Sequence, residues 1–198
     1  MAEEETNEAT EEKSEDVDEY GLAIQKYLST VLVVVPPEAY AETTLRYARS
    51  SLYNVHVGTR SVSSSADDLI KGAFQDEFMV DGQLAGETME PYSGVIFVGG
   101  PGALAVADDP NAQALARQAC EQQKLIGAWG HGVAVLARAG VVRGRKVTGD
   151  PSLEAEIRKA GGRYTGVQVQ RDGHLVTAVD DAAGMRFGQR LVEIVGIR

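Results

Sequence analysis

The sequence is poor in the residues from which covalent cross-links and metal sites are built. Its 198 residues include one cysteine, Cys120, and three histidines that are scattered along the chain. A single cysteine excludes an intramolecular disulfide and a cysteine-built metal site, and the histidine spacing fits no metal motif. Chains without disulfides are typical of the cytoplasm. We therefore expect a cytoplasmic protein that holds no metal and no cofactor.

Long apolar runs are also missing. No stretch approaches the roughly 20 apolar residues that span a bilayer. The first residues are acidic and polar, so they lack the basic region and the apolar core of a secretory signal. We expect neither a signal peptide nor a membrane partner.

Basic residues are scarce in one region, the first 20 positions. Residues 1–20 carry ten acidic side chains and one lysine, Lys13, whereas the net charge of the whole chain is −10. The rest of the chain is nearly neutral, so we expect no nucleic-acid partner. Because residues 1–20 contain few large apolar side chains, we expect a disordered acidic tail. Such a tail serves either solubility or docking to a basic partner, and the sequence leaves both open.

The body of the chain alternates apolar strands with amphipathic helices. We expect strands over 31–35, 53–58, 78–80, 94–98, 125–129 and 146–148, and helices over 38–52, 111–123, 131–139, 151–160 and 180–195. A short helix over 21–29 and a hairpin over 166–179 complete the pattern. This alternation predicts a mostly parallel sheet covered on both faces. The expected fold is an α/β three-layer sandwich, in one domain over residues 21–198.

Glycines mark the end of one expected strand, 94–98. Gly99 and Gly100 follow it directly. Ligands of open α/β sheets gather at the carboxyl ends of strands. Glycines at such an end let bare backbone N–H groups approach an oxyanion, although a simple tight turn would use them equally well.

A second pair of glycines follows the expected strand 125–129, where Gly130 and Gly132 flank His131. A sharp strand-to-helix turn of this kind has the shape of a nucleophile elbow, in which the exposed residue is serine or cysteine. Here that residue is Gly130. Glycine has neither the hydroxyl nor the thiol that covalent catalysis requires.

Three segments together resemble the ThiJ/PfpI family. They are Gly-Ala-Trp-Gly-His-Gly and its continuation over 127–148, Val-Gly-Gly-Pro-Gly-Ala over 98–103, and Asp-Gly-His-Leu-Val-Thr over 172–177. The segments follow the family's order, and the resemblance covers nearly the whole body. It implies a flavodoxin-like fold, related to the class I glutamine amidotransferase domain, and a homodimer. The family includes deglycases, intracellular peptidases, glyoxalases and holding chaperones.

Two departures from the family pattern bear on function. The family's elbow cysteine falls on Gly130, while His131 keeps the histidine that follows it. The family also places a glutamate early in the first helix, and that site aligns with Thr44, or with Glu42 if the loop is two residues shorter. The resemblance therefore implies a protein that has lost its nucleophile.

The main hypothesis is a catalytically inactive member of the family with a small-ligand pocket at the former elbow. The candidate ligand-binding residues are Gly99, Gly100, Gly130, His131 and Glu42, and the ligand is a small anion or carbonyl compound. The alternative is a hydrolase, glyoxalase or deglycase of altered mechanism, in which His131, with Glu42, acts as general base on a bound water. A holding chaperone would need an exposed apolar patch.

Four other residues have simpler predicted roles. Cys120 lies in an expected helix and should be a small buried side chain. His56 alternates with valines in an expected strand, and His174 should be exposed in the hairpin. Trp129, the only tryptophan, should pack in the core.

Overall fold

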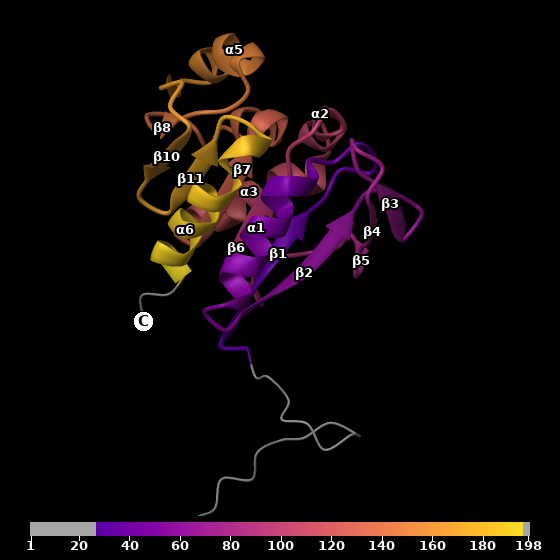
Figure 1. Cartoon of the computed structure of the whole chain (residues 1–198). Helices are drawn as coiled ribbons and strands as arrows, with labels where there is room; N and C mark the ends of the chain where they lie inside the picture. The colour runs from indigo at the N-terminus through magenta and orange to yellow at the C-terminus, as the bar shows by residue number, and fades with distance from the viewer. Residues whose placement is uncertain (1–26, 196–198) are drawn as a thin grey trace, which may run out of the picture.

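The computed structural model describes residues 27–195, with a seven-stranded sheet at the centre (Figure 1). The strand order is β10-β11-β7-β6-β1-β2-β5. All neighbours are parallel except β10 and β11, which form an antiparallel hairpin. The strands are β1 (Ser29–Val34), β2 (Val57–Ser63), β5 (Gly82–Gln83), β6 (Gly94–Phe97), β7 (Leu125–Trp129), β10 (Val169–Asp172) and β11 (Leu175–Ala178). The predicted mostly parallel sheet is confirmed.

Helices cover both faces of this sheet, so the predicted three layers are present. The helices on one face are α1 (Glu42–Tyr53) and α6 (Gly184–Val195), and those on the other are α2 (Ala103–Ala107), α3 (Pro110–Glu121) and α4 (Val133–Arg138). Beyond the sheet, α5 (Glu154–Lys159) packs beside the short pair β8 (Lys146–Val147) and β9 (Arg163–Tyr164). A separate antiparallel hairpin is formed by β3 (Leu69–Lys71) and β4 (Glu77–Met79).

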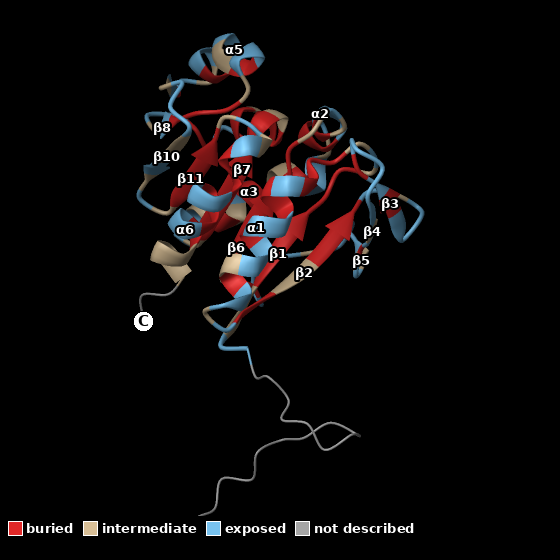
Figure 2. Cartoon of the chain, in the orientation of Figure 1, coloured by how far each residue is buried: buried red, intermediate tan, exposed pale blue. Residues whose placement is uncertain are grey.

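The alternation of side chains along the strands supplies both faces of the core. In β1, Val31 and Val33 pack with α1 and α6, whereas Leu32 and Val34 pack with α3 and α4. All four are at most 1% exposed. Figure 2 shows the burial concentrated in the strands and on the inner sides of the helices. Burial on both faces explains why these strands are continuous apolar runs.

Several element boundaries differ from the sequence-based expectation. The helix expected from residue 38 begins at Glu42, because the chain first runs through a loop in which Ala39 has a φ of 47°. The strand expected over 53–58 begins at Val57, since Tyr53 still belongs to α1. His56 lies in the turn between them with a φ of 58°, so its predicted place in a strand is wrong.

Four elements were not expected from the pattern: α2, β3, β5 and β9. All are five residues or shorter, which leaves too little length for a periodicity. Of the short helix expected over 21–29, residues 21–26 lie outside the described residues and Ser29 belongs to β1. The predicted acidic tail over 1–20 also lies outside them.

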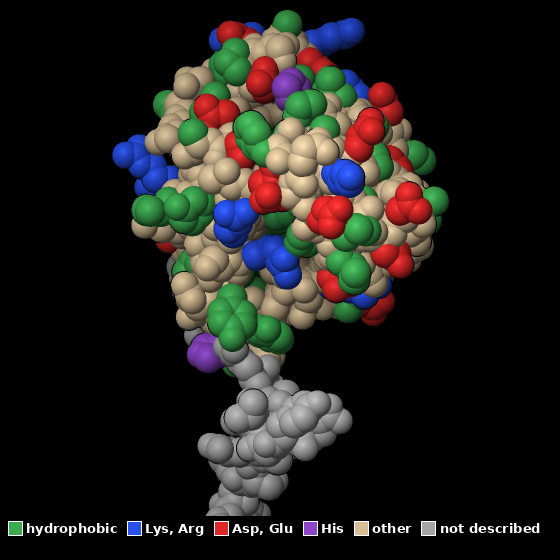
Figure 3. Space-filling model, turned by 45° about the vertical axis from the view of Figure 1, so that its right-hand side comes forward, with side chains coloured by type: hydrophobic (Ala, Val, Ile, Leu, Met, Phe, Trp, Pro, Cys, Tyr) green, Lys and Arg blue, Asp and Glu red, His purple; other side chains and the backbone are tan. Residues whose placement is uncertain are grey.

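Charged side chains of both signs share the surface. On the face seen in Figure 3, acidic and basic side chains are interspersed rather than gathered by sign. Among the helices of residues 27–195, none has the length and apolar character needed to cross a membrane.

Candidate functional site

The carboxyl ends of β1, β6, β7 and β11 meet at one edge of the sheet, because these strands are parallel. The chain passes from β1 to β2 on one side, whereas β6 pairs with the opposite side of β1. The order of the strands therefore reverses between β1 and β6. Such a reversal opens a crevice outside the strand ends, which is the usual ligand position in α/β sheets.

The loop after β6 requires its glycines because it packs against the loop after β1. The Gly99 carbonyl accepts a hydrogen bond of 2.9 Å from the Ala41 N–H. Gly100 has a φ of 109°, and a Cβ there would collide with the backbone of Ala39 and Ala41. Within the described residues, the N–H groups of Gly99 and Gly100 donate no hydrogen bond. Neighbouring N–H groups without an internal acceptor are the kind that binds an oxygen atom of a ligand, while Gly99 itself is buried and Gly100 partly buried.

The elbow, residues 128–132, comprises the end of β7 and a 3₁₀ turn, Gly130–Gly132, that leads into α4. Gly130 has a φ of 53°, the left-handed conformation expected at a nucleophile elbow. A Cβ built on Gly130 meets only the Val179 carbonyl oxygen, at 4.0 Å. A Cβ on Gly132 would instead lie 2.7 Å from the Phe97 carbonyl oxygen. The elbow thus has room for a Cβ at Gly130, and the sequence supplies none.

The His131 side chain lies beside Asp150, a residue that sequence reasoning did not identify as part of the site. The His131 Nε2 and Asp150 Oδ1 atoms are 3.8 Å apart, and both side chains are about one-third exposed, at 28% and 31%. Asp150 also accepts hydrogen bonds from the Ser152 N–H (2.9 Å) and hydroxyl (2.6 Å), while its own N–H lies 3.4 Å from the Gly130 carbonyl oxygen. Asp150 is therefore held in place next to the elbow.

The ionisation of Asp150 reflects these contacts. Burial alone would raise its pKa, but the two Ser152 donors and the neighbouring His131 outweigh burial, so the pKa is lowered from its usual value of 3.8. The sequence did contain one signal, since an aspartate before a proline is a common helix N-cap. That signal predicts a cap and not a place beside His131.

Glu42 and Thr44, the two positions considered for the family's glutamate, contact other parts of the molecule. Glu42 is 6% exposed, and its Oε1 accepts a 2.6 Å hydrogen bond from the Phe74 N–H in the β3–β4 hairpin. Its Oε2 has no partner. The Thr44 hydroxyl donates to the Asp181 carbonyl oxygen at 2.9 Å. Within residues 27–195, no hydrogen bond or ion pair joins either residue to His131.

The structure therefore groups four of the five candidate residues at one edge. Gly99 lies against the carbonyl and indole of Trp129, which directly precedes Gly130 and His131, and Gly100 follows Gly99. Glu42 instead turns its carboxylate toward the β3–β4 hairpin. Four pockets formed by the described residues lie elsewhere, and neither Gly130 nor His131 lines any of them. Within residues 27–195, no cluster of three potential metal ligands is present.

The remaining candidate residues are structural. Trp129 is fully buried, with its ring 5.4 Å from that of Phe187, so its core role is confirmed. Cys120 is partly buried and packs against the core on the α3 side. His174 is half-buried, so the exposure predicted from its place in the hairpin is wrong. Burial and the nearby Arg145 lower the pKa of His174, while Asp172 acts in the opposite direction.

Comparison with known proteins agrees with this fold. The family model described as DJ-1/PfpI matches residues 29–194. An uncharacterized protein of Methanocaldococcus jannaschii is 24% identical over 168 residues, which cover 83% of this chain and 82% of that protein. A protein of Pyrococcus horikoshii named as a deglycase is 29% identical over 89 residues, which cover 45% of this chain and 54% of that protein.

Solved structures share the fold. A ThiJ/PfpI domain protein from Brachyspira murdochii superposes with a TM-score of 0.81 at 21% identity, over 86% of this chain and 98% of that one. The DJ-1beta protein of Drosophila melanogaster gives a TM-score of 0.75 at 22% identity, over 85% and 91%. These likenesses establish the flavodoxin-like architecture predicted from the sequence.

Proposed function

Because the chain belongs to the DJ-1/PfpI family, we propose that it is a member without covalent chemistry that binds a small carbonyl compound or anion at the elbow. The observation that carries the proposal is the residue at the turn. Gly130 holds the left-handed conformation of an elbow residue and has room for a Cβ, yet it offers neither thiol nor hydroxyl. The chain therefore has no nucleophile at this position that could attack a substrate.

The backbone around Gly130 supports binding without that step. The N–H groups of Gly99 and Gly100 are free to donate, and they lie at the strand ends that also carry the elbow. Neighbouring N–H groups of this kind bind carbonyl and carboxylate oxygens. His131, at the same edge, adds a donor or acceptor for a second polar atom of the ligand.

A second candidate function rests on the His131–Asp150 contact. In this alternative the chain is a hydrolase, glyoxalase or deglycase that activates water. His131 accepts a proton from water as the water oxygen bonds to the carbonyl carbon of the substrate. Asp150 orients the imidazole and stabilises its charged form, and the free N–H groups bind the oxyanion. Asp150 takes the orienting role that the sequence suggested for Glu42, because it is the carboxylate that lies beside His131.

Steady-state assays of the full chain distinguish the two candidates. Methylglyoxal, a glycated peptide and an unmodified peptide serve as substrates, with buffer as the blank. The main proposal predicts no turnover above the blank for any of the three. The alternative predicts turnover that is lost in His131→Gln and strongly reduced in Asp150→Asn. His174→Gln is the matched control, since His174 lies in the β10–β11 turn and should leave any turnover unchanged.

Location and assembly belong to the same proposal. We propose a cytoplasmic homodimer, on the grounds of the low cysteine content and the family resemblance. Sedimentation velocity at micromolar concentration tests the assembly, and a single species at the monomer mass of 21.1 kDa would contradict it.

A further inference from the structure

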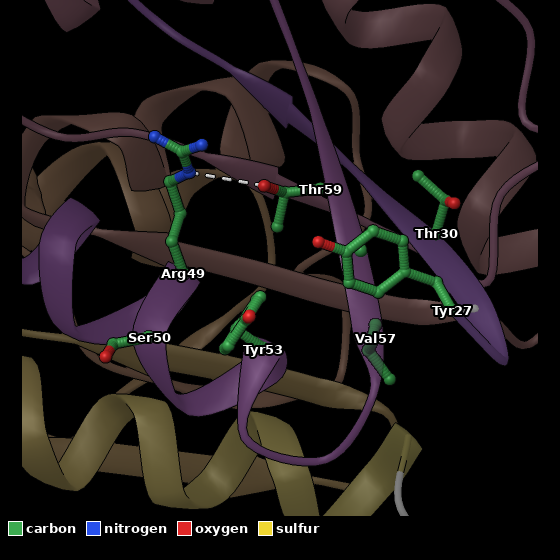
Figure 4. Close-up of a pocket in the computed structure, with 8 residues that line it drawn as sticks. Tyr27, Thr30, Arg49, Ser50, Tyr53, Val57 and Thr59 are labelled. Carbon is green, nitrogen blue, oxygen red and sulfur yellow. Dashed lines mark hydrogen bonds between the residues drawn. The ribbon is translucent and has the colours of Figure 1, made fainter. Parts of the chain in front are cut away.

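A pocket of about 320 Å³ lies away from the elbow, at the amino ends of β1 and β2 (Figure 4). It is formed by the C-terminal half of α1, the start of β2 and the residues at the entry to β1. Its lining residues are Tyr27, Thr30, Arg49, Ser50, Tyr53, Val57, Gly58 and Thr59. Because β1 and β2 are parallel strands, their amino ends lie at the edge of the sheet opposite to the elbow.

Arg49 is the one charged residue among those lining residues. Its Nε donates a 3.2 Å hydrogen bond to the Thr59 hydroxyl, as Figure 4 shows, and its guanidinium carbon lies 5.0 Å from the centre of the Phe78 ring. These two contacts fix the plane of the guanidinium. Within the described residues Arg49 forms no ion pair with a carboxylate. Its two terminal nitrogens therefore have no ion-paired carboxylate, but acidic side chains lie nearby: Arg49 also lines a second pocket with Asp76 and Glu77, and its charge helps to lower the pKa of Asp81.

Two tyrosines form the aromatic walls of the pocket. The rings of Tyr27 and Tyr53 are 6.3 Å apart and inclined at 66°, an edge-to-face pair, and the two residues are 46% and 51% exposed. The Tyr27 ring packs against Gly58, and a Cβ at Gly58 would lie 3.0 Å from that ring. A glycine at this position lets the tyrosine lie close to β2. The hydroxyls of Thr30, Ser50 and Thr59 add polar groups around the rings.

We propose that this pocket binds a small aromatic carboxylate. The carboxylate pairs with the terminal nitrogens of Arg49, since a guanidinium that forms no ion pair of its own matches a carboxylate in shape and charge. The aromatic ring of the ligand packs against Tyr53 and Tyr27. The volume of the pocket is at the lower end of the range for small-molecule sites, which suits a single-ring compound.

The test is an NMR titration of the full chain with benzoate, observed at the Arg49 Nε–H and the Tyr53 ring protons. We expect shifts at both groups and a dissociation constant in the millimolar range, as for other ligands of this size. Benzamide has the same shape without the charge and should bind about tenfold more weakly, and so should benzoate to Arg49→Gln. Tyr53→Leu should weaken binding several-fold.

Arg46→Gln is the matched control. Arg46 is on the same helix and is exposed, but it pairs with Asp76 at 2.8 Å and does not line the pocket. Its variant should bind benzoate within twofold of the parent. Equal affinity for benzamide and benzoate, or unchanged affinity in Arg49→Gln with an unchanged urea midpoint, would overturn the proposal. So would the absence of shifts at Arg49 and Tyr53.

One further variant separates two sources of the carboxylate. The ten acids of residues 1–20 belong to the same chain and precede Tyr27 closely, so their carboxylates are a second source of the same chemistry. The titration is therefore repeated on a full-length variant in which these ten acids are changed to amides. Tighter benzoate binding that persists at high salt would show that the carboxylates of residues 1–20 compete for Arg49, and unchanged binding would assign the pocket to a free ligand. Loss of benzoate binding in this variant would overturn the proposal.

Discussion

Replacing Gly130 with alanine tests the conformation of the elbow without removing any contact. The new methyl group has room, because the closest atom, the Val179 carbonyl oxygen, is 4.0 Å away. The cost therefore comes from the backbone, which holds a φ of 53°. A residue with a Cβ costs roughly 1–2 kcal/mol in this left-handed region. Restriction of the unfolded chain offsets about 0.4–1 kcal/mol of that. We expect a net loss of about 1 kcal/mol in the free energy of unfolding.

Two glycines serve as internal references for this measurement. Gly140, at the end of α4, has a φ of 78° and no atom within 4 Å of the position that a new methyl group would take, so Gly140→Ala should cost the same. Gly132→Ala should cost several times more, because its Cβ would lie 2.7 Å from the Phe97 carbonyl oxygen. Urea denaturation of the parent and the three variants gives the differences. A Gly130→Ala variant that is more stable than the parent, or as unstable as Gly132→Ala, would refute the reasoning.

Three further outcomes are expected. Gly130→Cys should fold, because a Cβ at this position meets no atom closer than 4.0 Å. It should not gain full deglycase activity, since the Glu42 carboxylate is bound at the Phe74 N–H, and full activity in the methylglyoxal assay would contradict this. Glu42→Gln should change the urea midpoint little, because it keeps an acceptor for the Phe74 N–H, whereas Glu42→Ala should be destabilising because it leaves that N–H without its acceptor. Asp150 has a lowered pKa in the folded state, so its contribution to stability is present above its unfolded pKa of 3.8 and is lost as the pH falls through the folded pKa. Asp150→Asn should therefore lower the free energy of unfolding at pH 7 and should lose less of it than the parent on acidification. Parallel curves of stability against pH for the two proteins would count against this.

The sheet and the elbow were predictable because their signals are local. Continuous apolar runs predicted the buried strands β1, β6 and β7, and glycines at strand ends predicted the two loops that meet at the edge of the sheet. The left-handed φ of Gly130 follows from the same pattern. These features depend on residues that are adjacent in sequence.

The partners of the site residues were not predictable, because they depend on how distant loops pack. Asp150 lies beside His131 only because the chain turns back toward the elbow after β8. From the sequence, Asp150 is recognisable only as a helix cap. Only alignment with the family pattern groups Glu42 with His131. Its actual partner, Phe74, lies in a hairpin whose strands are three residues long and carry almost no periodic signal.

The central claim is that the elbow binds a small carbonyl compound or anion without transforming it. The most direct measurement is an NMR titration of the ¹⁵N-labelled full chain with pyruvate, which carries both a carbonyl and a carboxylate. The account predicts saturable shifts of the Gly99, Gly100 and His131 amide signals, reversal of the shifts on dialysis, and recovery of the pyruvate unchanged. Unperturbed amide signals at these three residues, or a new product in the sample, would contradict it.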